Sequence, residues 1–327
     1  MTTVSTAPKH EPPTPARTRG EFMRNAIALF RHFGVTLRRG QKRETIQWMR
    51  SLPFLLMHLT PLLAFVVGFS PVAAWVAFGF WLVRMFAITG FYHRYFSHRA
   101  FKTSRVMQAI MAFWGGTAVQ KGALWWAAHH RDHHRYSDEP EDVHSPVRHG
   151  FWWSHVGWVL SGPFKPTAMN KVKELARYPE LRFLDRFHVL PGIVAGAGMF
   201  GLGALLERMA PSLGTSGGQM LVWGFFVSTL LLYHTTYTIN SLTHTFGTRR
   251  YATKDDSRNH WLFALITLGE GWHNNHHHYP SSARMGFFWY EYDPTYWGLW
   301  VMSKLGLIWD LRPVPAHVRE AVPERSS

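Results

Sequence analysis

Residues 125–135 read WWAAHHRDHHR, and they place His130, His133 and His134 in an H-x-x-H-H pattern directly after a bulky apolar run. If the segment is helical, residues four apart share a face, whereas adjacent residues point about 100° apart. His130 and His134 can then bind one metal ion, while His133 turns towards a neighbouring ion. This stretch therefore predicts one part of a site for two metal ions.

A second H-x-x-H-H triplet lies far downstream, in residues 269–277, which read GEGWHNNHH. The same helical geometry places His273 and His277 on one ion and turns His276 towards the other. Two interlocking triplets of this kind predict a two-metal centre that draws its ligands from distant parts of the chain.

Two more motifs follow apolar blocks. His93 and His98 belong to HRYFSH, and their spacing of five suits one helical face poorly, so they can converge only if the helix ends or unwinds between them. Asn240 and His244 are four apart and share a face. The candidate histidine ligands number nine: His93, His98, His130, His133, His134, His244, His273, His276 and His277.

The composition favours an integral membrane protein. The 327 residues are 46% hydrophobic and 16% aromatic, and the apolar residues gather in a few blocks. The net charge of +15 suits an anionic lipid surface or a phosphate-bearing substrate; the apolar blocks and the lack of nucleic-acid motifs exclude a nucleic-acid partner. Because there is no cysteine, the chain has no disulfide, thiolate metal site or cysteine-ligated iron–sulfur cluster.

We predict an all-α membrane protein with four transmembrane helices in two hairpins, at about 52–69, 71–92, 187–206 and 219–239. Residues 1–20 read as a disordered tail, 21–50 as a basic amphipathic lead-in, 51–310 as the membrane domain and 311–327 as a C-terminal tail. Arginine-rich segments lie outside the hairpin connections, so the positive-inside rule places both termini and a helical cap, from 93–186 and 240–310, in the cytoplasm.

Two further features lie within or close after the second span. The stretch Val106–Trp126 is short and broken by Gly115-Gly116, so we place it in the membrane interface rather than across the bilayer. Arg84 lies inside the second span, where an ionisable residue is a functional candidate, or near the interface if that helix projects into the cytoplasm.

The motifs HRYFSH, HRDHHRYSD, N-S-x-x-H-x-x-G and GEGWHN-x-HH, with SHVGW between them, resemble those of the membrane-bound acyl-CoA (stearoyl-CoA, delta-9) desaturases. The resemblance covers roughly residues 50–310. It implies a four-helix transmembrane stalk under a cytosolic cap that holds a histidine-rich di-iron centre, with two Fe²⁺ ions and O2 as co-substrate.

Carried over by position, the resemblance assigns His93, His98, His130, His134 and His276 to one iron. It assigns His133, His244, His273 and His277 to the other, where Asn240 holds a water ligand. The departures are Asn275, where relatives often have an aromatic residue, and His278-Tyr279, where many have Ala-Phe.

Imidazole also suits zinc and copper, so ligand type alone does not identify the metal. Carboxylates are expected to orient the ligand rings. The sequence offers five nearby options: Asp132, Asp138, Glu139, Asp142 and Glu270. The remaining histidines near the motifs or within the spans are expected to be neighbours or packing residues: His58, His129, His144, His149, His155, His234 and His278.

A long alkyl substrate needs an apolar tunnel into the cap. Trp81 and Met85 lie on one face of the second span, about 18 Å and 12 Å along the helix from His93. We hypothesise that one of them closes the tunnel and limits chain length; plain helix packing is the alternative.

The function expected is O2-dependent insertion of a cis double bond, at C9, into a saturated long-chain acyl-CoA or acyl lipid. A separate electron donor of ferredoxin, rubredoxin or cytochrome-b5 type, with its reductase, is implied because the chain has no flavin or nicotinamide fingerprint. A hydroxylase on the same scaffold is the enzyme alternative, and a membrane metal carrier or sensor is the remote one. The absence of an organellar leader favours a bacterial inner membrane.

Overall fold

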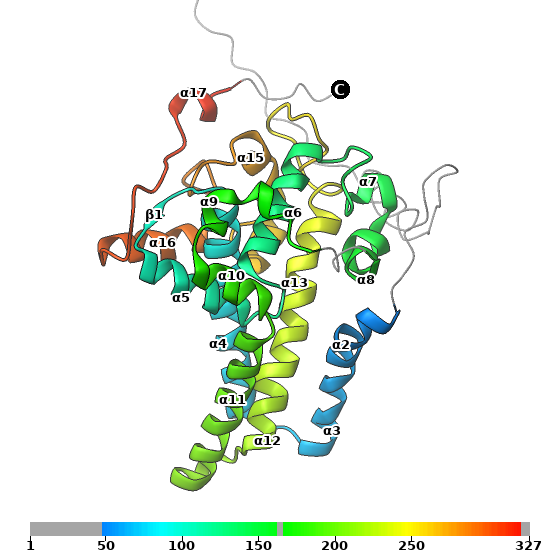
Figure 1. Ribbon diagram of the computed structural model, residues 1–327, viewed down its shortest axis with the longest axis vertical. Coiled ribbons are helices and arrows are strands. Elements are labelled where there is room, and N and C mark those ends of the chain that lie inside the picture. The colour runs from blue at the N-terminus through cyan, green and yellow to red at the C-terminus, as the bar shows by residue number, and fades with distance from the viewer. Residues whose placement is uncertain (1–47, 162–165, 322–327) are drawn as a thin grey trace, which may run out of the picture.

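The computed structural model describes residues 48–161 and 166–321, and these are mostly helical. Figure 1 shows a narrow stalk of long helices beneath a wider cap of shorter ones. The predicted tail at 1–20 lies outside the described residues, as does the predicted lead-in except for 48–50.

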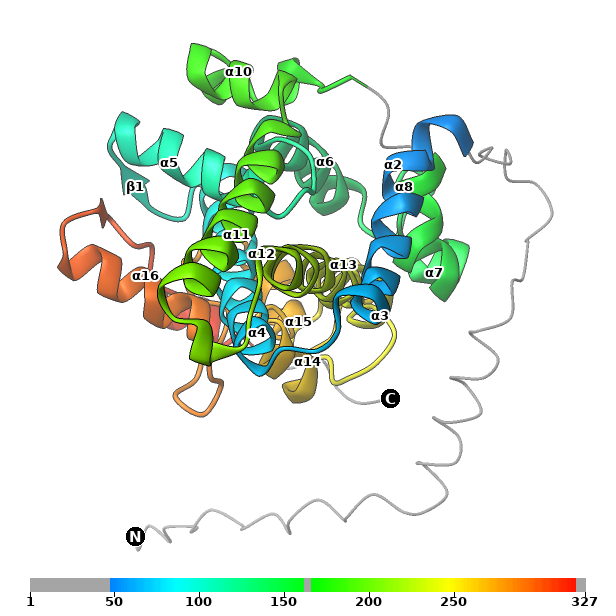
Figure 2. The same ribbon diagram turned by 90° about the horizontal axis from the view of Figure 1, so that it is seen from below.

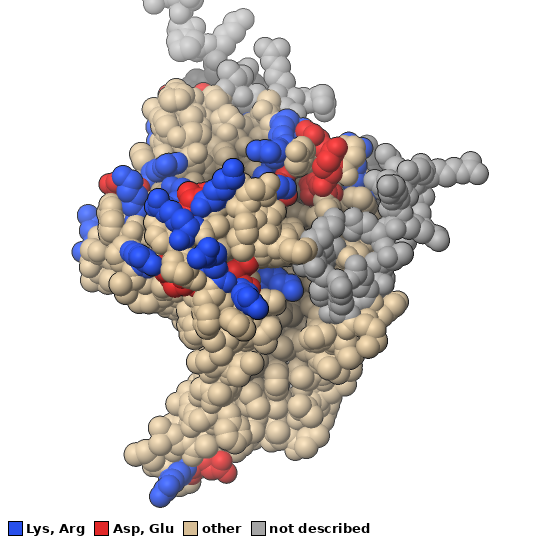
Figure 3. Space-filling model, in the orientation of Figure 1, with Lys and Arg blue, Asp and Glu red and all other residues tan. Residues whose placement is uncertain are grey.

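The stalk is built from four apolar segments of the chain. Their helices are α2 (Trp48–Leu59), η1 (Thr60–Leu63), α3 (Ala64–Val67), α4 (Pro71–Phe86), η2 (Ala87–Ser97), α11 (Leu190–Met209), η5 (Pro211–Leu213), α12 (Gly217–Gln219), η6 (Met220–Val227) and α13 (Ser228–Leu242). Seen from below, α13 lies between the α2–α3 segment and the pair α4 and α11 (Figure 2). The stalk surface in view is almost free of charged side chains between its tip and the cap (Figure 3).

Local signals in the sequence explain the first hairpin. Gly68 ends α3 with a φ of 74°, in the left-handed region that glycine adopts without strain. Ser70 then caps α4 by accepting a hydrogen bond from the Ala73 amide at 3.3 Å, with Pro71 at the first helical position. The two segments of the predicted hairpin are therefore separated by a tight turn.

Among the described residues, two helices are long and apolar enough to cross a membrane: Pro71–Ser97, of 27 residues, and Leu190–Met209, of 20. The first predicted segment corresponds to a shorter apolar helix, Ser51–Val67. The fourth loses its apolar character in the second half of α13, which is rich in Thr, Tyr and His. The prediction of four spans goes beyond these two helices and stays a prediction.

Close contact between α11 and the start of the fourth segment depends on glycine. A Cβ on Gly203 would lie 2.4 Å from the Ser216 carbonyl oxygen and 2.6 Å from the Met220 Cβ. Small residues let helices approach closely where lipid surrounds them. Gly192, Gly196 and Gly203 form the packing face of α11, whereas Gly198 and Gly201 have open space around them.

The cap contains shorter helices and one pair of two-residue strands. Its elements are β1 (Lys102–Thr103), α5 (Arg105–Gly116), α6 (Ala123–Tyr136), α7 (Pro146–His149), η3 (Trp153–Gly157), α8 (Trp158–Ser161), η4 (Met169–Lys171), α9 (Lys173–Ala176), α10 (Pro179–Arg186), α14 (Trp261–Ile266), α15 (His273–His278), α16 (Pro294–Lys304), β2 (Ile308–Trp309) and α17 (Ala316–Arg319). The stretch predicted at the interface is two helices, α5 and the start of α6, joined by residues 117–122.

The segment predicted as a C-terminal tail packs on the cap over its described part. Strand β2 pairs antiparallel with β1. Beyond it, the Arg312 amide donates to the Ala100 carbonyl at 2.9 Å, and the Tyr251 hydroxyl donates to the Arg319 carbonyl at 2.9 Å. Residues 311–319 therefore belong to the folded cap.

Arg84 ties the stalk helices together beneath the cap. Its guanidinium is fully buried and donates to the Thr117 carbonyl at 3.2 Å, the Thr229 hydroxyl at 2.7 Å and the Ser228 hydroxyl at 2.5 Å. The side chain also lies over the Phe80 ring, 4.2 Å from its centre. Buried polar groups are stable only when they are hydrogen-bonded. Through these bonds Arg84 joins α4 to α13 and to the loop after α5.

Candidate metal centre

Nine histidines converge where the stalk meets the cap, in two adjacent groups. In each group one ring nitrogen from every member lies within 4.8 Å of the others. The first group contains His93, His98, His130, His134 and His276, and the second contains His133, His244, His273 and His277. The structure thus divides the two H-x-x-H-H triplets between the groups, as helices α6 and α15 require.

The wide helical turn of η2 brings His93 and His98 together. Residues 87–97 form a π-helix, in which hydrogen bonds join residues five apart; the His98 amide donates to the His93 carbonyl at 3.3 Å. The two ring centres lie 4.9 Å apart. The coil is thus wider than an α-helix, so residues five apart share a face, and the helix ends at Ser97, directly before His98. The expectation that the helix ends or unwinds between the two histidines is confirmed.

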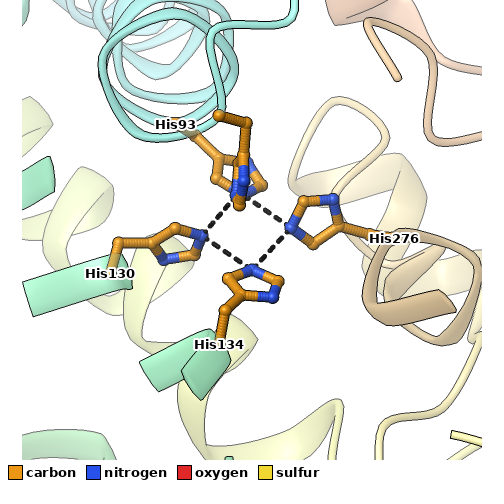
Figure 4. A group of neighbouring side chains, drawn as sticks. His93, His130, His134 and His276 are labelled. Atoms are coloured by element: carbon orange, nitrogen blue, oxygen red, sulfur yellow. Dashed lines mark hydrogen bonds between the residues drawn. The ribbon is translucent and has the colours of Figure 1, made fainter. Parts of the chain in front are cut away.

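The ring nitrogens of the first group point at a common centre, as Figure 4 shows for His130, His134 and His276. The Nε2 atoms of His98 and His130 lie 2.8 Å apart, and those of His93 and His276 lie 3.0 Å apart. Two nitrogen ligands at right angles about a metal with bonds of about 2.0–2.1 Å would lie about 3.0 Å apart. The first group therefore has the spacing of ligands around one metal ion.

The second group has the same character. The Nε2 atoms of His273 and His244 lie 3.1 Å apart. The Nε2 atom of His277 is buried and has no hydrogen-bond partner among the described residues. Orphaned buried nitrogens are rare in native proteins, and a metal ion would satisfy this one. The donor set of both groups thus fits metal ions.

Carboxylates hold the outer nitrogen of four of the rings. Asp142 accepts from His133 Nδ1 at 3.0 Å, Asp138 from His244 Nδ1 at 2.8 Å and Asp255 from His277 Nδ1 at 2.7 Å. His93 Nδ1 makes the corresponding contact with Glu270. Such partners fix the ring and its tautomer so that Nε2 presents a lone pair to a metal. Three of these four pairs serve the second group.

Three of the five carboxylates expected to orient the ligand rings do contact them, and two do not. Asp138, Asp142 and Glu270 contact ligand rings, whereas Asp132 pairs with Lys171 and the exposed Glu139 lies 3.7 Å from Lys254. Asp255 was not among the options. It lies in the loop that precedes α14, 22 residues from the histidine that it contacts, and only the tertiary fold brings the two together.

The electrostatics favour neutral rings in the first histidine group and an ionised carboxylate at Asp138, whereas at His133 burial is outweighed by the contact with Asp142, which raises the pKa. Burial, with help from neighbouring imidazoles, holds the pKa values of His130, His134 and His276 well below the ordinary value. Burial acts to raise the pKa of Asp138, but its bonds to His244, to Ser145 and to a backbone amide lower that pKa to about 2. Metal binding requires deprotonated imidazole, and His130, His134 and His276 meet that requirement.

A buried ionic network supports His93. Glu270 accepts from the Arg94 guanidinium at 3.0 Å, and Asp293 accepts from the same guanidinium at 2.9 Å and 3.0 Å. Arg94 also donates to the Ala283 carbonyl at 2.8 Å. Because Asp293 caps α16 as well, the network fixes α16 relative to the ligand helix η2.

A cavity of about 370 Å³ leads to the first histidine group from the stalk side. It lies between α2, α6, α8 and α13, and its wall is mostly aromatic and aliphatic. His130 and Asn240 are both in this wall. Asn240 is half-buried at the end of α13, so it stands at the cavity beside the histidines. Its predicted part in holding a water ligand stays a prediction.

The predicted tunnel residues do not line this cavity. Trp81 and Met85 are buried, and neither is among the cavity's lining residues. The Met85 sulfur lies 4.0 Å from the hydroxyl of Thr236, which does line the cavity. Trp81 stacks on Phe78 instead. The chain-length hypothesis therefore stays open for Met85 in particular.

The other histidines and Asn275 are held by other partners. His129 stacks on Trp125, and His278 stacks on Tyr251. His155 bridges Ser241 and His234, 2.9 Å and 3.1 Å away. Contacts of this kind also occupy His58, His144 and His149.

Asn275 turns away from the histidines. Its side chain donates to the Met285 carbonyl at 3.0 Å and to Glu291 at 2.9 Å, and it accepts from Asn259 at 2.7 Å. The polar residue at this position therefore stabilises the loop after α15 rather than shaping the cavity.

Two adjacent groups of buried and half-buried imidazoles have carboxylate partners on four of their rings, and His130 lies in the wall of an apolar cavity. This arrangement is typical of a metal-dependent enzyme that acts on an apolar substrate. The family model described as fatty acid desaturase matches residues 71–307. The chain therefore belongs to the membrane fatty acid desaturase family and is a desaturase, an oxidoreductase.

Similar curated proteins differ in the carrier of the acyl chain. An sn-1 stearoyl-lipid 9-desaturase from Anabaena variabilis is 35% identical over 81% of this chain and 93% of its own length. A hex-5-enoyl-[acyl-carrier protein] acetylenase from Moorena producens (strain JHB) is 34% identical over 85% of this chain and 91% of its own. An acyl-CoA C20 Delta5-desaturase from Anemone leveillei is 33% identical, with 77% of each chain covered.

Proposed function

We propose that this protein is an O2-dependent desaturase that inserts a cis double bond at C9 of a saturated long-chain acyl group with a di-iron centre. The observation that carries the proposal is the pair of histidine groups, each converging within 4.8 Å, with His130 of the first group in the wall of an apolar cavity. Two of the relatives named as 9-desaturases, from Anabaena variabilis and Synechocystis, are 35% identical to this chain and support the position.

In this proposal each histidine group holds one iron, and Asn240 holds a water on the second. Bound iron supplies the strong oxidant, formed by reducing O2, that removing hydrogen from unactivated methylenes requires. The reaction takes one hydrogen from each of two neighbouring methylenes; O2, with two electrons and two protons from the donor side, leaves as two waters.

The protein's own residues position the reactants. Asp138, Asp142 and Asp255 hold the Nδ1 protons of their histidines, so that the Nε2 lone pairs face inward. The rings of Trp125 and Trp126 wall the cavity beside His130 and exclude water from the acyl chain. Placement of one pair of methylenes against His130 and Asn240 would set the position of the double bond.

The topology that fits this function has four spans, with both termini and the metal centre on the cytoplasmic side. Exposed tryptophans on the cap support a contact with the membrane interface, where such rings are enriched. They are Trp261, Trp289, Trp297, Trp300 and Trp309. The proposed domain runs from residue 51 to about 319 rather than to 310, because residues 311–319 pack on the cap. A bacterial inner membrane belongs to the same proposal.

Electrons would come from a separate ferredoxin-, rubredoxin- or cytochrome-b5-type donor with its reductase. The chain has no cysteine for an iron–sulfur centre of its own. The net charge of +15 favours association with an acidic partner.

The test is fatty-acid analysis with double-bond location in a host that lacks its own desaturase, supplied with iron and a reductase system. Wild type should produce cis-C9 monounsaturated chains. His277→Ala should abolish them, whereas His278→Ala, a change one residue away at a side chain outside both groups, should retain them.

Hydroxylated products would move the protein to the hydroxylase class. Unsaturated chains with the bond elsewhere would overturn the C9 assignment alone. Equal product from wild type and His277→Ala would contradict the role of the second histidine group.

A further inference from the structure

The wall of the cavity that reaches His130 includes two exposed apolar residues where the stalk meets the cap. They are Pro53, within α2, and Val189, just before α11, which is 52% exposed. We take these two residues as the rim of the cavity. The exposed residues next to this rim on the stalk are apolar, among them Leu52 and Ile193. An acyl chain in the outer part of the cavity would therefore pass directly into the hydrocarbon layer in which the stalk is proposed to lie.

Polar atoms occur at the rim where an ester would lie. Lys121 and His188 both line the cavity close to Val189, and their side-chain nitrogens are 3.5 Å apart. Lys121 precedes α6 and His188 precedes α11, so both lie where the stalk meets the cap. A donor-bearing pair between an apolar stalk and a polar cap suits the ester and glycerol oxygens of a membrane lipid.

The polar end of the same cavity system suits a phosphate-bearing carrier poorly. A second cavity, of about 330 Å³, shares His129, His144 and Trp158 with the first. The charged residues in its wall are Asp132, Glu141, Asp142 and Lys171. The lysine is paired with Asp132, and Asp142 contacts His133 and His144 of the same wall, so the negative charge left without such a contact in this wall is that of Glu141. Like charge disfavours the phosphates of coenzyme A or of a carrier protein's phosphopantetheine arm.

We propose that the substrate is the acyl chain of an intact membrane glycerolipid, which enters sideways from the bilayer past Val189. The ester group lies beside Lys121 and His188 while the chain runs inward to His130 and Asn240. This inference rests on the proposed desaturase function and adds the identity of the acyl carrier.

The direct test offers the iron-loaded protein two carriers in vesicles, with one electron-donor system that reduces the centre. One probe is phosphatidylglycerol with a deuterated stearoyl chain, and the other is deuterated stearoyl-CoA. Because purified protein brings no acyltransferase, mass spectrometry of each intact carrier reports which one was desaturated. We expect the lipid to react at least roughly tenfold faster, because misplacing a reacting group by about 1 Å can cost about 100-fold in rate.

The outcomes separate the two proposals. Faster reaction of stearoyl-CoA would overturn the lipid inference and leave the desaturase function standing. Reaction only of deuterated stearoyl-carrier protein, offered as a third probe, would likewise overturn the lipid inference alone. No reaction of any of the three probes, with the centre loaded and reduced, would contradict the desaturase function itself.

A pair of variants tests the side entrance. Val189→Trp places a large ring at the rim, whereas Ile193→Trp adds the same ring one turn further along α11, at a 62% exposed position outside the cavity wall. We expect Val189→Trp to slow lipid desaturation roughly tenfold or more with unchanged iron content, and Ile193→Trp to react like wild type. Equal lipid rates in the two variants would refute entry past Val189.

Discussion

Replacing Asp138 by Asn should weaken metal binding by the second histidine group while leaving the fold intact. One oxygen of Asp138 accepts from His244 Nδ1 at 2.8 Å and from the Asp256 amide at 2.9 Å, and the other accepts from the Ser145 hydroxyl at 2.6 Å. The asparagine oxygen can keep the first two bonds, and the Ser145 hydroxyl can turn to accept from the new amide. Asp138 also has a φ of 60°, which asparagine adopts readily.

The substitution therefore removes mainly the negative charge behind His244. Changes to such outer partners of a metal ligand cost roughly 10–100-fold in metal affinity, or about 1.4–2.8 kcal/mol. The assay is iron content per chain against a graded series of chelator concentrations, with circular dichroism to monitor folding. About half of the iron, that of the second group, should leave Asp138→Asn at lower chelator concentration than wild type.

Glu139→Gln is the matched control. Glu139 is adjacent in sequence but exposed, with Lys254 at 3.7 Å, and such surface pairs contribute about 0–1 kcal/mol. If Asp138→Asn keeps both irons up to the same chelator concentration as wild type, the carboxylate does not raise the metal affinity of the second group. The reasoning from the His244 contact would then be wrong.

Three further predictions concern the stalk and the cavity. Gly115→Ala should lower the thermal unfolding temperature, because a Cβ there would lie 2.1 Å from the Tyr92 ring and overpacking costs about 1–3 kcal/mol; Gly79→Ala, with open space around it, should not. Arg84→Lys should destabilise the protein by roughly 2 kcal/mol, because lysine cannot reach all of the guanidinium's hydrogen-bond partners. The measurement is thermal unfolding at constant iron content, and an unchanged unfolding temperature would contradict the role of Arg84 in joining α4 and α13. Met85→Ala should enlarge the space behind the cavity wall and shift products towards longer chains in gas chromatography, and unchanged lengths would exclude Met85 as the stop.

The division of the two histidine triplets could be predicted because it depends on local geometry alone. Residues four apart on α6 and α15 must share a face, whatever the rest of the fold does, and His133 and His276 must point elsewhere. The position of the long helices could be predicted as well, since apolar length is a property of the sequence.

Other features depend on non-local contacts or on backbone geometry without a sequence signal. The π-helix at 87–97 has the same apolar composition as an α-helix would, so the spacing of His93 and His98 looked unfavourable. Asp255 reaches His277 only through tertiary folding. Asn275 could not be oriented from sequence either, because its partners Glu291 and Met285 come from a later loop.

The most direct test of the central claim is the number of metal ions that the two histidine groups hold. Elemental analysis combined with iron-57 Mössbauer spectroscopy should find two irons per folded wild-type chain, and one in either His134→Ala or His244→Ala. A folded, fully active protein with a single iron, or variants that keep both irons, would contradict a centre built from the two groups.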